Sequence, residues 1–144
     1  MIDKDLVRRK LARLSQYLTR LSPLAQKTLN EYKNDDYLRF STERLIELIV
    51  ECAVDVNNHV VVEAGNRPPE DYTTSFSRAA ETGLISRDLA DKLKGSAGMR
   101  NVLVHEYMDI DDEMVFRSIP LALDGFKEFI KQAERFIEKL ETTG

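Results

Sequence analysis

Apolar residues recur at steps of three and four along most of the chain, and this spacing constrains the fold more than any other feature. It is plainest near the N-terminus, at Leu6, Val7, Leu11, Leu14, Tyr17, Leu18 and Leu21. Residues at these steps lie on one face of an α-helix, whereas a half-buried strand requires alternation of apolar and polar residues. The sequence shows no convincing alternation of that kind. It therefore predicts an all-α fold.

Capping and turn residues divide the helical pattern into five or six helices. We expect them at about residues 3–21, 22–32, 37–64 and 73–81, from Arg87 to an acidic break at 109–112, and from that break to about Glu141. Ser22 is the expected N-cap of the second helix, with Pro23 at its first helical position. Pro120 should kink the last helix. The order predicts an up-and-down bundle that forms one domain over residues 1–144.

The third expected helix is apolar around most of its circumference. Its apolar residues include Leu45, Ile46, Leu48, Ile49, Val50, Cys52, Ala53, Val54, Val56, Val60, Val61 and Val62. In so small a domain, a helix that must be covered on all sides often implies a partner subunit. The β-branched end at residues 60–62 could be read as a strand. Its continuity with the preceding helix, and the stop signal Gly65-Asn66, favour a helix.

The charge balance restricts the possible nucleic-acid functions. The chain has a net charge of −4 and a calculated pI of about 5.3. Proteins that coat nucleic acid non-specifically usually carry the opposite charge, because affinity rises with the number of phosphates neutralised. A nucleic-acid function would therefore depend on a local cationic site. Lys4, Arg8, Arg9, Lys10 and Arg13 give the first helix a basic flank, although such a flank is more often only a solvated face.

Nothing in the sequence points to a membrane or to export. No apolar run approaches the ~20 residues that a membrane span requires, and residues 1–5 contain no apolar signal core. Cys52 is the only cysteine, so the chain cannot form an internal disulfide, and a reduced cytoplasmic setting is the simplest expectation. Neither Cys52 nor the two histidines, His59 and His105, have the spacing of a metal site. No metal and no cofactor are therefore expected.

Four polar side chains gather near the end of the fifth expected helix: Arg100, Asn101, His105 and Tyr107. At about 100° per residue, Arg100 and Tyr107 share one stripe of a helix, and Asn101 and His105 share another about a third of a turn away. If the helix ends before Tyr107, its phenol gains freedom. A permanently charged guanidinium near an imidazole that titrates around neutral pH suits the handling of a phosphodiester. On spacing alone, however, such a group more often consists of ordinary surface residues.

This pattern resembles the motif of the HEPN superfamily, the higher eukaryote and prokaryote nucleotide-binding domains. The sequence Arg-Asn-x-x-x-His-x-Tyr is similar in particular to the signature of the HepT-like toxins, in which four residues separate Arg from His and one separates His from Tyr. Asp55-Val56-Asn57-Asn58-His59 resembles the second polar island of that family, and the helix order is similar from end to end. The resemblance implies a HEPN-like bundle and a toxin–antitoxin pair of type VII. The chain would be the homodimeric toxin, and an MNT-type minimal nucleotidyltransferase the antitoxin.

The resemblance also implies an activity and roles for the motif residues. The toxin would be a metal-independent endoribonuclease that cleaves tRNA or mRNA, not DNA, by attack of a ribose 2′-hydroxyl on its own 3′ phosphodiester. His105 would move the proton, Arg100 would bind the phosphate, and Asn101 would orient the histidine or bind a phosphate oxygen. Two subunits would contribute one imidazole each to a shared cleft. Tyr107 would accept AMP from the antitoxin, and the added bulk and charge would block the RNA site.

Two questions stay open at the level of sequence. Asp55 and His59 stand four residues apart, and we expect them to form a buried hydrogen-bonded pair that fixes the core or a dimer interface. Asn58, with Asp55 and His59, lines the active-site cleft in the alternative interpretation. The alternative function is a non-catalytic nucleotide- or substrate-binding subunit of a minimal nucleotidyltransferase. The complete set of Arg100, Asn101 and His105 favours the enzyme.

Overall fold

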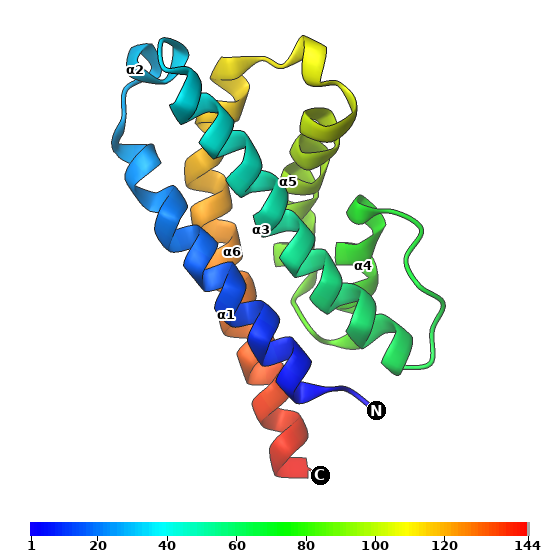
Figure 1. Cartoon of the computed structure of the whole chain (residues 1–144). Helices are drawn as coiled ribbons and strands as arrows, with labels where there is room; N and C mark the ends of the chain where they lie inside the picture. Colours follow the sequence, from blue (N-terminus) through cyan, green and yellow to red (C-terminus); the bar gives the residue numbers. More distant parts are fainter. Residues whose placement is uncertain (144) are drawn as a thin grey trace.

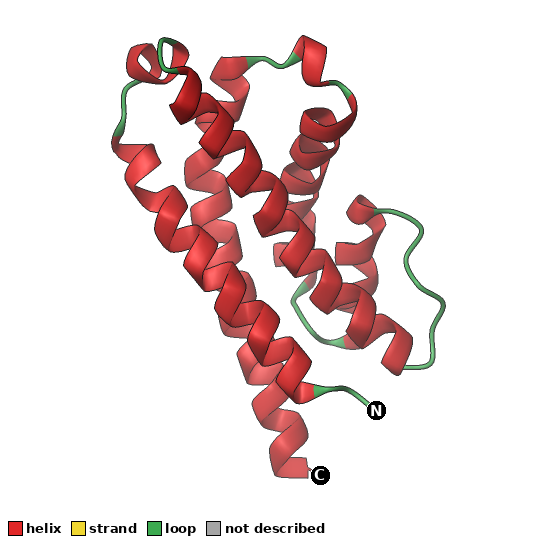
Figure 2. Ribbon diagram, viewed as in Figure 1, coloured by secondary structure: helices red, strands yellow, loops and turns green. Residues whose placement is uncertain are grey.

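The computed structural model describes residues 1–143, which form helices and loops with no β-strand (Figure 2). The α-helices are α1 Lys4–Leu21, α2 Leu29–Lys33, α3 Asp36–Glu63, α4 Tyr72–Thr82, α5 Arg87–His105 and α6 Asp112–Thr143. Two 3₁₀ turns, η1 Ser22–Gln26 and η2 Tyr107–Asp109, complete the helical elements. The all-α prediction is confirmed, and the β-branched end of α3 is helical. The last residue of the single domain expected over 1–144 lies outside the described residues, and that boundary stays a prediction.

The long helices α1, α3 and α6 run along the bundle, and α4 lies beside α3 and α5 (Figure 1). Both termini lie at one end of the molecule. The connection between α5 and α6, drawn in yellow, lies at the opposite end together with α2 (Figure 1). No helix within residues 1–143 is long and apolar enough to cross a membrane. The topology therefore places the end of the motif helix α5 at the end of the bundle away from the termini.

The core is built from the apolar stripes that the sequence displays. Phe76 of α4 packs edge-on against Phe126 and Phe129 of α6, with ring centroids 6.3 and 6.2 Å apart. Twelve residues of α3 are buried, and α1, α4 and α5 of the same chain supply most of the packing around this helix. The apolar circumference of α3 therefore does not require a partner subunit, and the sequence-based argument for one is wrong on this point.

Most helix ends carry the caps that the sequence indicates. The Ser86 hydroxyl accepts a hydrogen bond from the Leu89 amide at 3.1 Å and begins α5. Gly83 ends α4 with φ +89°, a left-handed conformation that glycine adopts at little cost. The helix α6 continues through Pro120.

The expected second helix at residues 22–32 is wrong in its N-cap and in its continuity. Ser22 has helical dihedrals, φ −52° and ψ −47°, and its hydroxyl caps nothing. A 3₁₀ turn that contains Pro23 follows, and the chain then extends at Lys27 and Thr28, each with ψ 161°. A second start is built there: the Thr28 hydroxyl accepts from the Glu31 amide, and the Glu31 carboxylate accepts from the Thr28 amide. This capping box makes α2 a separate helix.

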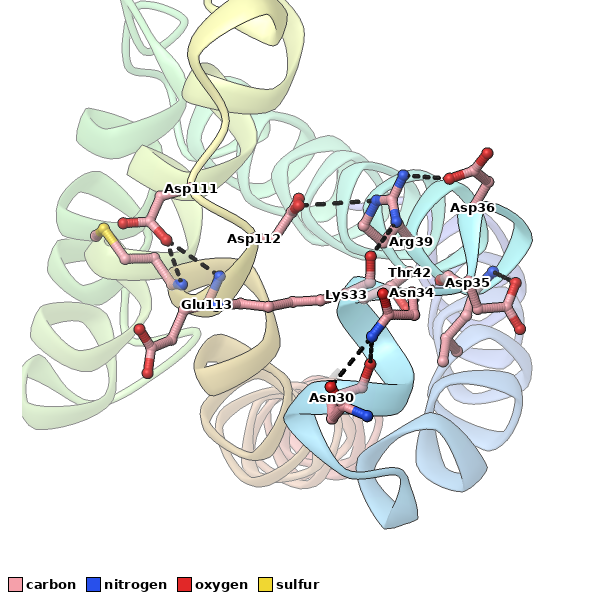
Figure 3. Close-up of polar contacts among 12 residues, drawn as sticks. Asn30, Lys33, Asn34, Asp35, Asp36, Arg39, Thr42, Asp111, Asp112 and Glu113 are labelled. Atoms are coloured by element: carbon pink, nitrogen blue, oxygen red, sulfur yellow. Dashed lines mark hydrogen bonds and ion pairs between the residues drawn. The ribbon is translucent and has the colours of Figure 1, made fainter.

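A guanidinium joins the N-terminal ends of α3 and α6 (Figure 3). Arg39 Nη1 donates to the carbonyl oxygen of Lys33 at 2.6 Å, and the same side chain pairs with Asp36. Its Nε lies 3.8 Å from Asp112 Oδ2, at the first residue of α6. Next to it, Asp111 Oδ1 accepts from the Glu113 amide at 3.1 Å and holds the first turn of α6. The segment between α5 and α6 is thus tied to α3 at its downstream end.

Candidate active site

The motif helix α5 ends at His105, which decides the geometry of the four polar residues. The Glu106 amide still donates to the Val102 carbonyl at 2.8 Å, but Glu106 itself leaves the helical region with φ −124° and ψ 36°. Tyr107 therefore lies in the separate turn η2. The predicted stripe shared by Arg100 and Tyr107 does not form, and the alternative, in which the helix ends before the tyrosine, is the one observed.

Arg100 is held from three sides although it lies close to the surface. Its guanidinium carbon stands 3.9 Å from the ring centroid of Tyr72, at the start of α4. Nη2 lies 3.6 Å from Glu51 Oε1 on α3, and Nη1 donates to Asn101 Oδ1 at 3.2 Å. A cation over a largely desolvated ring gains about 1–2 kcal/mol. The packing of three helices therefore fixes this positive charge in one place.

Two acids stand near this guanidinium on α3, one turn apart. Glu51 forms the ion pair, and Glu47 precedes it. Burial raises the pKa of the Glu47 carboxyl, an effect that the guanidiniums of Arg44 and Arg100 oppose. Arg100 thus faces two acids of α3, and its ion pair with Glu51 helps to orient the guanidinium.

Asn101 and His105 lie on the outer side of α5, where they share a stripe as predicted. His105 is exposed, and Asn101 is half-buried. Gly98 continues the same stripe towards the N-terminus, and a Cβ atom built on Gly95 or Gly98 would meet no heavy atom within 4 Å. These glycines are therefore not required for packing inside the chain. They leave the surface beside Asn101 and His105 open to an incoming molecule.

The polar island on α3 is arranged differently from the sequence-based expectation. Asp55 Oδ2 accepts from Lys10 Nζ at 2.8 Å, and His59 Nε2 accepts from the Asp3 amide at 2.8 Å. The predicted Asp55–His59 pair is therefore wrong, because α1 and the N-terminal residues offer each side chain a closer partner. Both residues face α1 and not the Arg100 site.

Unsatisfied polar atoms remain on the other side of α3. Asn57 Nδ2 donates to Ser75 Oγ at 3.2 Å inside the core. Asn58 stands seven residues after Glu51 and so shares its stripe of the helix. Its Oδ1 is buried without a hydrogen-bond partner, and so is Nε of Arg100. Buried polar atoms are normally paired, so each of these two atoms keeps an unused capacity for a hydrogen bond. That Asn58 lines the cleft stays a prediction.

Sequence reasoning missed two of the three residues that hold Arg100, namely Glu51 and Tyr72. Glu51 was visible as an acid within an apolar helix, seven residues before Asn58, and that spacing was the available signal. Tyr72 follows the Asp71 cap of α4 and lies 28 positions before Arg100. No helical periodicity connects residues on different helices, so only the fold brings this ring to the guanidinium.

Tyr107 is displayed on a short turn at the edge of the site. Its side chain is 67% exposed, and that of Met108 is 82% exposed. The Asp109 amide donates to the Glu106 carbonyl at 2.9 Å and closes the turn. The helix end of α5 and the Arg39–Asp112 contact hold the two sides of this segment. The backbone of the turn is therefore held on both sides, and the phenol that it carries is open to a large partner.

The residues described, 1–143, include no group of three or more His, Cys, Asp or Glu side chains placed to hold a metal ion. That the protein works without a metal stays a prediction from the family resemblance. Cys52 is free and buried, and burial raises the pKa of its thiol.

Comparisons with known proteins agree with this fold and motif. The family model "Ribonuclease HepT-like" matches residues 11–133. A "tRNA nuclease HepT" from Aphanizomenon flos-aquae is 29% identical over 140 residues, which cover 97% of this chain and 95% of the relative. An "mRNA nuclease HepT" from Shewanella oneidensis is 26% identical over 126 residues, 88% of this chain and 94% of the relative.

Among solved structures, the tri-AMPylated HEPN toxin of Shewanella oneidensis, in complex with its MNT antitoxin, superposes with a TM-score of 0.81. It is 25% identical, and the match covers 91% of this chain and 98% of that one. The family model matches most of the sequence, and the bundle and the motif at the end of α5 agree with it. The chain therefore belongs to the HepT-like ribonuclease family.

Proposed function

We propose that this HepT-like ribonuclease is the toxin of a toxin–antitoxin pair and cleaves RNA with Arg100, Asn101 and His105. The observation that carries the proposal is the fixed guanidinium of Arg100 on the same helix end as an exposed imidazole. The two relatives described above are a tRNA nuclease and an mRNA nuclease, so RNA is the substrate class. A binding module would have less need for both a phosphate-binding cation and a proton-transferring imidazole at one site.

Arg100 binds the scissile phosphate in this proposal. Its guanidinium is always charged and presents several donors in a plane, which suits two non-bridging phosphate oxygens. The charge on these oxygens grows as the 2′-hydroxyl attacks, so a cation already held by Tyr72 and Glu51 stabilises the transition state without reorganising. Asn101 binds one guanidinium nitrogen through its Oδ1, and its amide nitrogen is available to a phosphate oxygen or to the histidine.

His105 moves protons, and a second subunit supplies a second imidazole. Arg100 and His105 are five positions apart on α5, so the two side chains leave the helix about 7.5 Å apart along the axis and about 140° apart around it. Cleavage needs one group to accept the 2′-hydroxyl proton and another to protonate the leaving oxygen. The open stripe of Gly95, Gly98, Asn101 and His105 gives a second copy of the chain room to approach. Support for a homodimer thus comes from the site, not from the burial of α3.

Tyr107 is the proposed point of control by an MNT-type nucleotidyltransferase antitoxin. The Shewanella toxin is AMPylated in complex with such an antitoxin. Here the exposed phenol of Tyr107 lies two residues beyond His105, on a turn that a partner can reach. An AMP group on it would place a negatively charged phosphodiester and a nucleoside beside the RNA site. Occupancy and charge repulsion would then block the substrate. A cytoplasmic location stays a prediction.

Purified protein should cleave RNA equally well with and without EDTA. The reaction as proposed uses a guanidinium and two imidazoles, and 2′-hydroxyl attack leaves a 2′,3′-cyclic phosphate and a 5′-hydroxyl. Gel analysis of tRNA and mRNA digests, with end-group mapping by mass spectrometry, tests both points. Loss of cleavage in EDTA, or fragments that carry a 5′-phosphate, would contradict the mechanism. Intact RNA under all conditions would instead favour a binding subunit.

Tyr72→Ala should slow cleavage by about tenfold or slightly more. The substitution removes a contact of about 1–2 kcal/mol that positions Arg100, and about 1.36 kcal/mol corresponds to a factor of ten in rate. Tyr72→Phe keeps the ring and is the matched control. We expect Tyr72→Phe to retain nearly the full cleavage rate of the parent. The measurement is kcat and KM on one RNA substrate, with melting temperatures recorded for both variants. Equal rates for the alanine and phenylalanine variants would show that the ring does not position Arg100.

A further inference from the structure

Positive charge is concentrated on one helix of this acidic chain. Residues 1–21 contain six Lys or Arg and two Asp, a side-chain net charge of +4, whereas residues 22–144 carry −8. A protein that binds a polyanion must do so where its cations are, because each phosphate contact adds to affinity through counterion release. The charge distribution therefore favours α1, in addition to Arg100, as a surface that contacts a polyanion.

The cations of α1 border a groove between α1 and α3. Arg9, Lys10 and Arg13 line its α1 side together with Tyr17, and its volume is about 360 Å³. Lys10 is already paired with Asp55 across the groove. Within residues 1–143, neither Arg9 nor Arg13 forms an ion pair with a carboxylate, and both are exposed. Two guanidiniums are thus available to an external anion.

The groove adjoins the candidate active site through Glu51. This residue lines the groove on its α3 side and also pairs with Arg100 at 3.6 Å. Figure 1 shows α3 lying between α1 and α5. Glu51 on α3 therefore has contacts on both sides, with the groove and with Arg100 of the motif helix. The four cations here, Arg9, Lys10, Arg13 and Arg100, still outnumber the three acids beside them, Glu47, Glu51 and Asp55. A negatively charged strand held at Arg100 therefore meets net positive charge on this side.

We infer that the groove between α1 and α3 binds the phosphate backbone of the RNA strand next to the cleavage site. This inference rests on the proposed ribonuclease function. Arg9 and Arg13 contact phosphates of nucleotides adjacent to the scissile one, and the half-buried ring of Tyr17 offers a surface on which a base can stack. The basic flank of α1 is then a substrate track and not merely a solvated face. It supplies affinity to a protein whose overall charge opposes RNA binding.

The test is RNA binding in a His105→Ala background, so that cleavage does not consume the probe. A labelled single-stranded oligoribonucleotide and a labelled tRNA are titrated at several salt concentrations, and Kd is measured by fluorescence anisotropy. Replacing Arg9 and Arg13 together by Gln should weaken binding about tenfold. It should also lower the slope of log K against log salt by about 1.4 on the single strand, since each lost phosphate contact removes about 0.7.

Two matched doubles make the result specific. Arg135→Gln with Lys139→Gln removes two exposed cations at the same spacing on α6, outside the groove, and should leave Kd and slope unchanged. Arg9→Lys with Arg13→Lys keeps the charge and should retain most of the slope. Thermal melting of each variant confirms that the bundle is folded.

Other outcomes overturn the inference in distinguishable ways. If the Arg9/Arg13 double to Gln binds RNA like its parent while His105→Ala still abolishes cleavage, the catalytic assignment stands and the groove assignment fails. If the double keeps RNA affinity but loses the complex with the nucleotidyltransferase, the groove is a protein interface. If the parent binds no RNA at all, the groove assignment and the proposed function fail together.

Discussion

His105→Ala is expected to reduce RNA cleavage by about 10³-fold or more. Proton transfer by a positioned side chain typically contributes a factor of about 10²–10⁴, and in a shared dimer site the substitution removes both imidazoles at once. Because His105 is exposed at the end of α5, its loss should not disturb the core. The measurements are the cleavage rate of purified protein and the growth of cells that express it. Growth arrest should disappear with the variant.

The other histidine provides the matched control. His59 accepts a hydrogen bond from the Asp3 amide, so His59→Ala removes an imidazole that binds the N-terminal residues and leaves α5 untouched. We expect cleavage within about twofold of the parent and a slightly lower melting temperature, since one hydrogen bond contributes about 1 kcal/mol. Equal losses in both variants would point to folding and not to chemistry. Full activity of His105→Ala would remove the histidine from the mechanism.

The fold was largely predictable because local signals and tertiary packing agree. The steps of three and four along α1 and α6, the Ser86 cap and the Gly83 stop all act within a few residues of one another, so a linear sequence displays them. The segment at Ser22 shows the limit of such reasoning. A Ser-Pro pair is a good helix start in isolation, but Thr28 and Glu31 form a better one six residues later.

The candidate site was predictable only in its residue types and not in its contacts. The family pattern selects Arg100, Asn101 and His105, and their roles stay a prediction. Spacing on one helix suggests that Asp55 and His59 pair. In the structure, Asp55 instead accepts a hydrogen bond from Lys10, and His59 accepts one from the Asp3 amide. Spacing says nothing of Tyr72, which the loop before α4 brings to Arg100. Contacts between helices depend on rotation and offset, which no period along one chain encodes.

Tyr107→Phe should abolish modification by the antitoxin and leave a toxin that the partner's enzyme activity cannot silence. AMP transfer requires the phenolic oxygen as the acceptor, and phenylalanine lacks only that atom. The aromatic ring, the turn η2 and its exposed position all remain. In cells that co-express a cognate nucleotidyltransferase, growth should therefore stop with the variant and continue with the parent. Intact-mass spectrometry of the purified toxin should show AMP adducts on the parent and none on Tyr107→Phe.

Tyr37 is the matched control, because its side chain is 85% exposed at the start of α3 and is far from the motif in sequence. Tyr37→Phe should be modified and neutralised like the parent. AMP adducts that persist on Tyr107→Phe but vanish on Tyr37→Phe would show that the modified tyrosine is Tyr37 on α3. Cells that survive with an unmodified Tyr107→Phe toxin would show that the antitoxin neutralises by binding alone. In that case the exposed side chains of Tyr107 and Met108 would form a contact surface for the antitoxin. Binding to such a surface does not require the phenolic oxygen, whereas AMP transfer does.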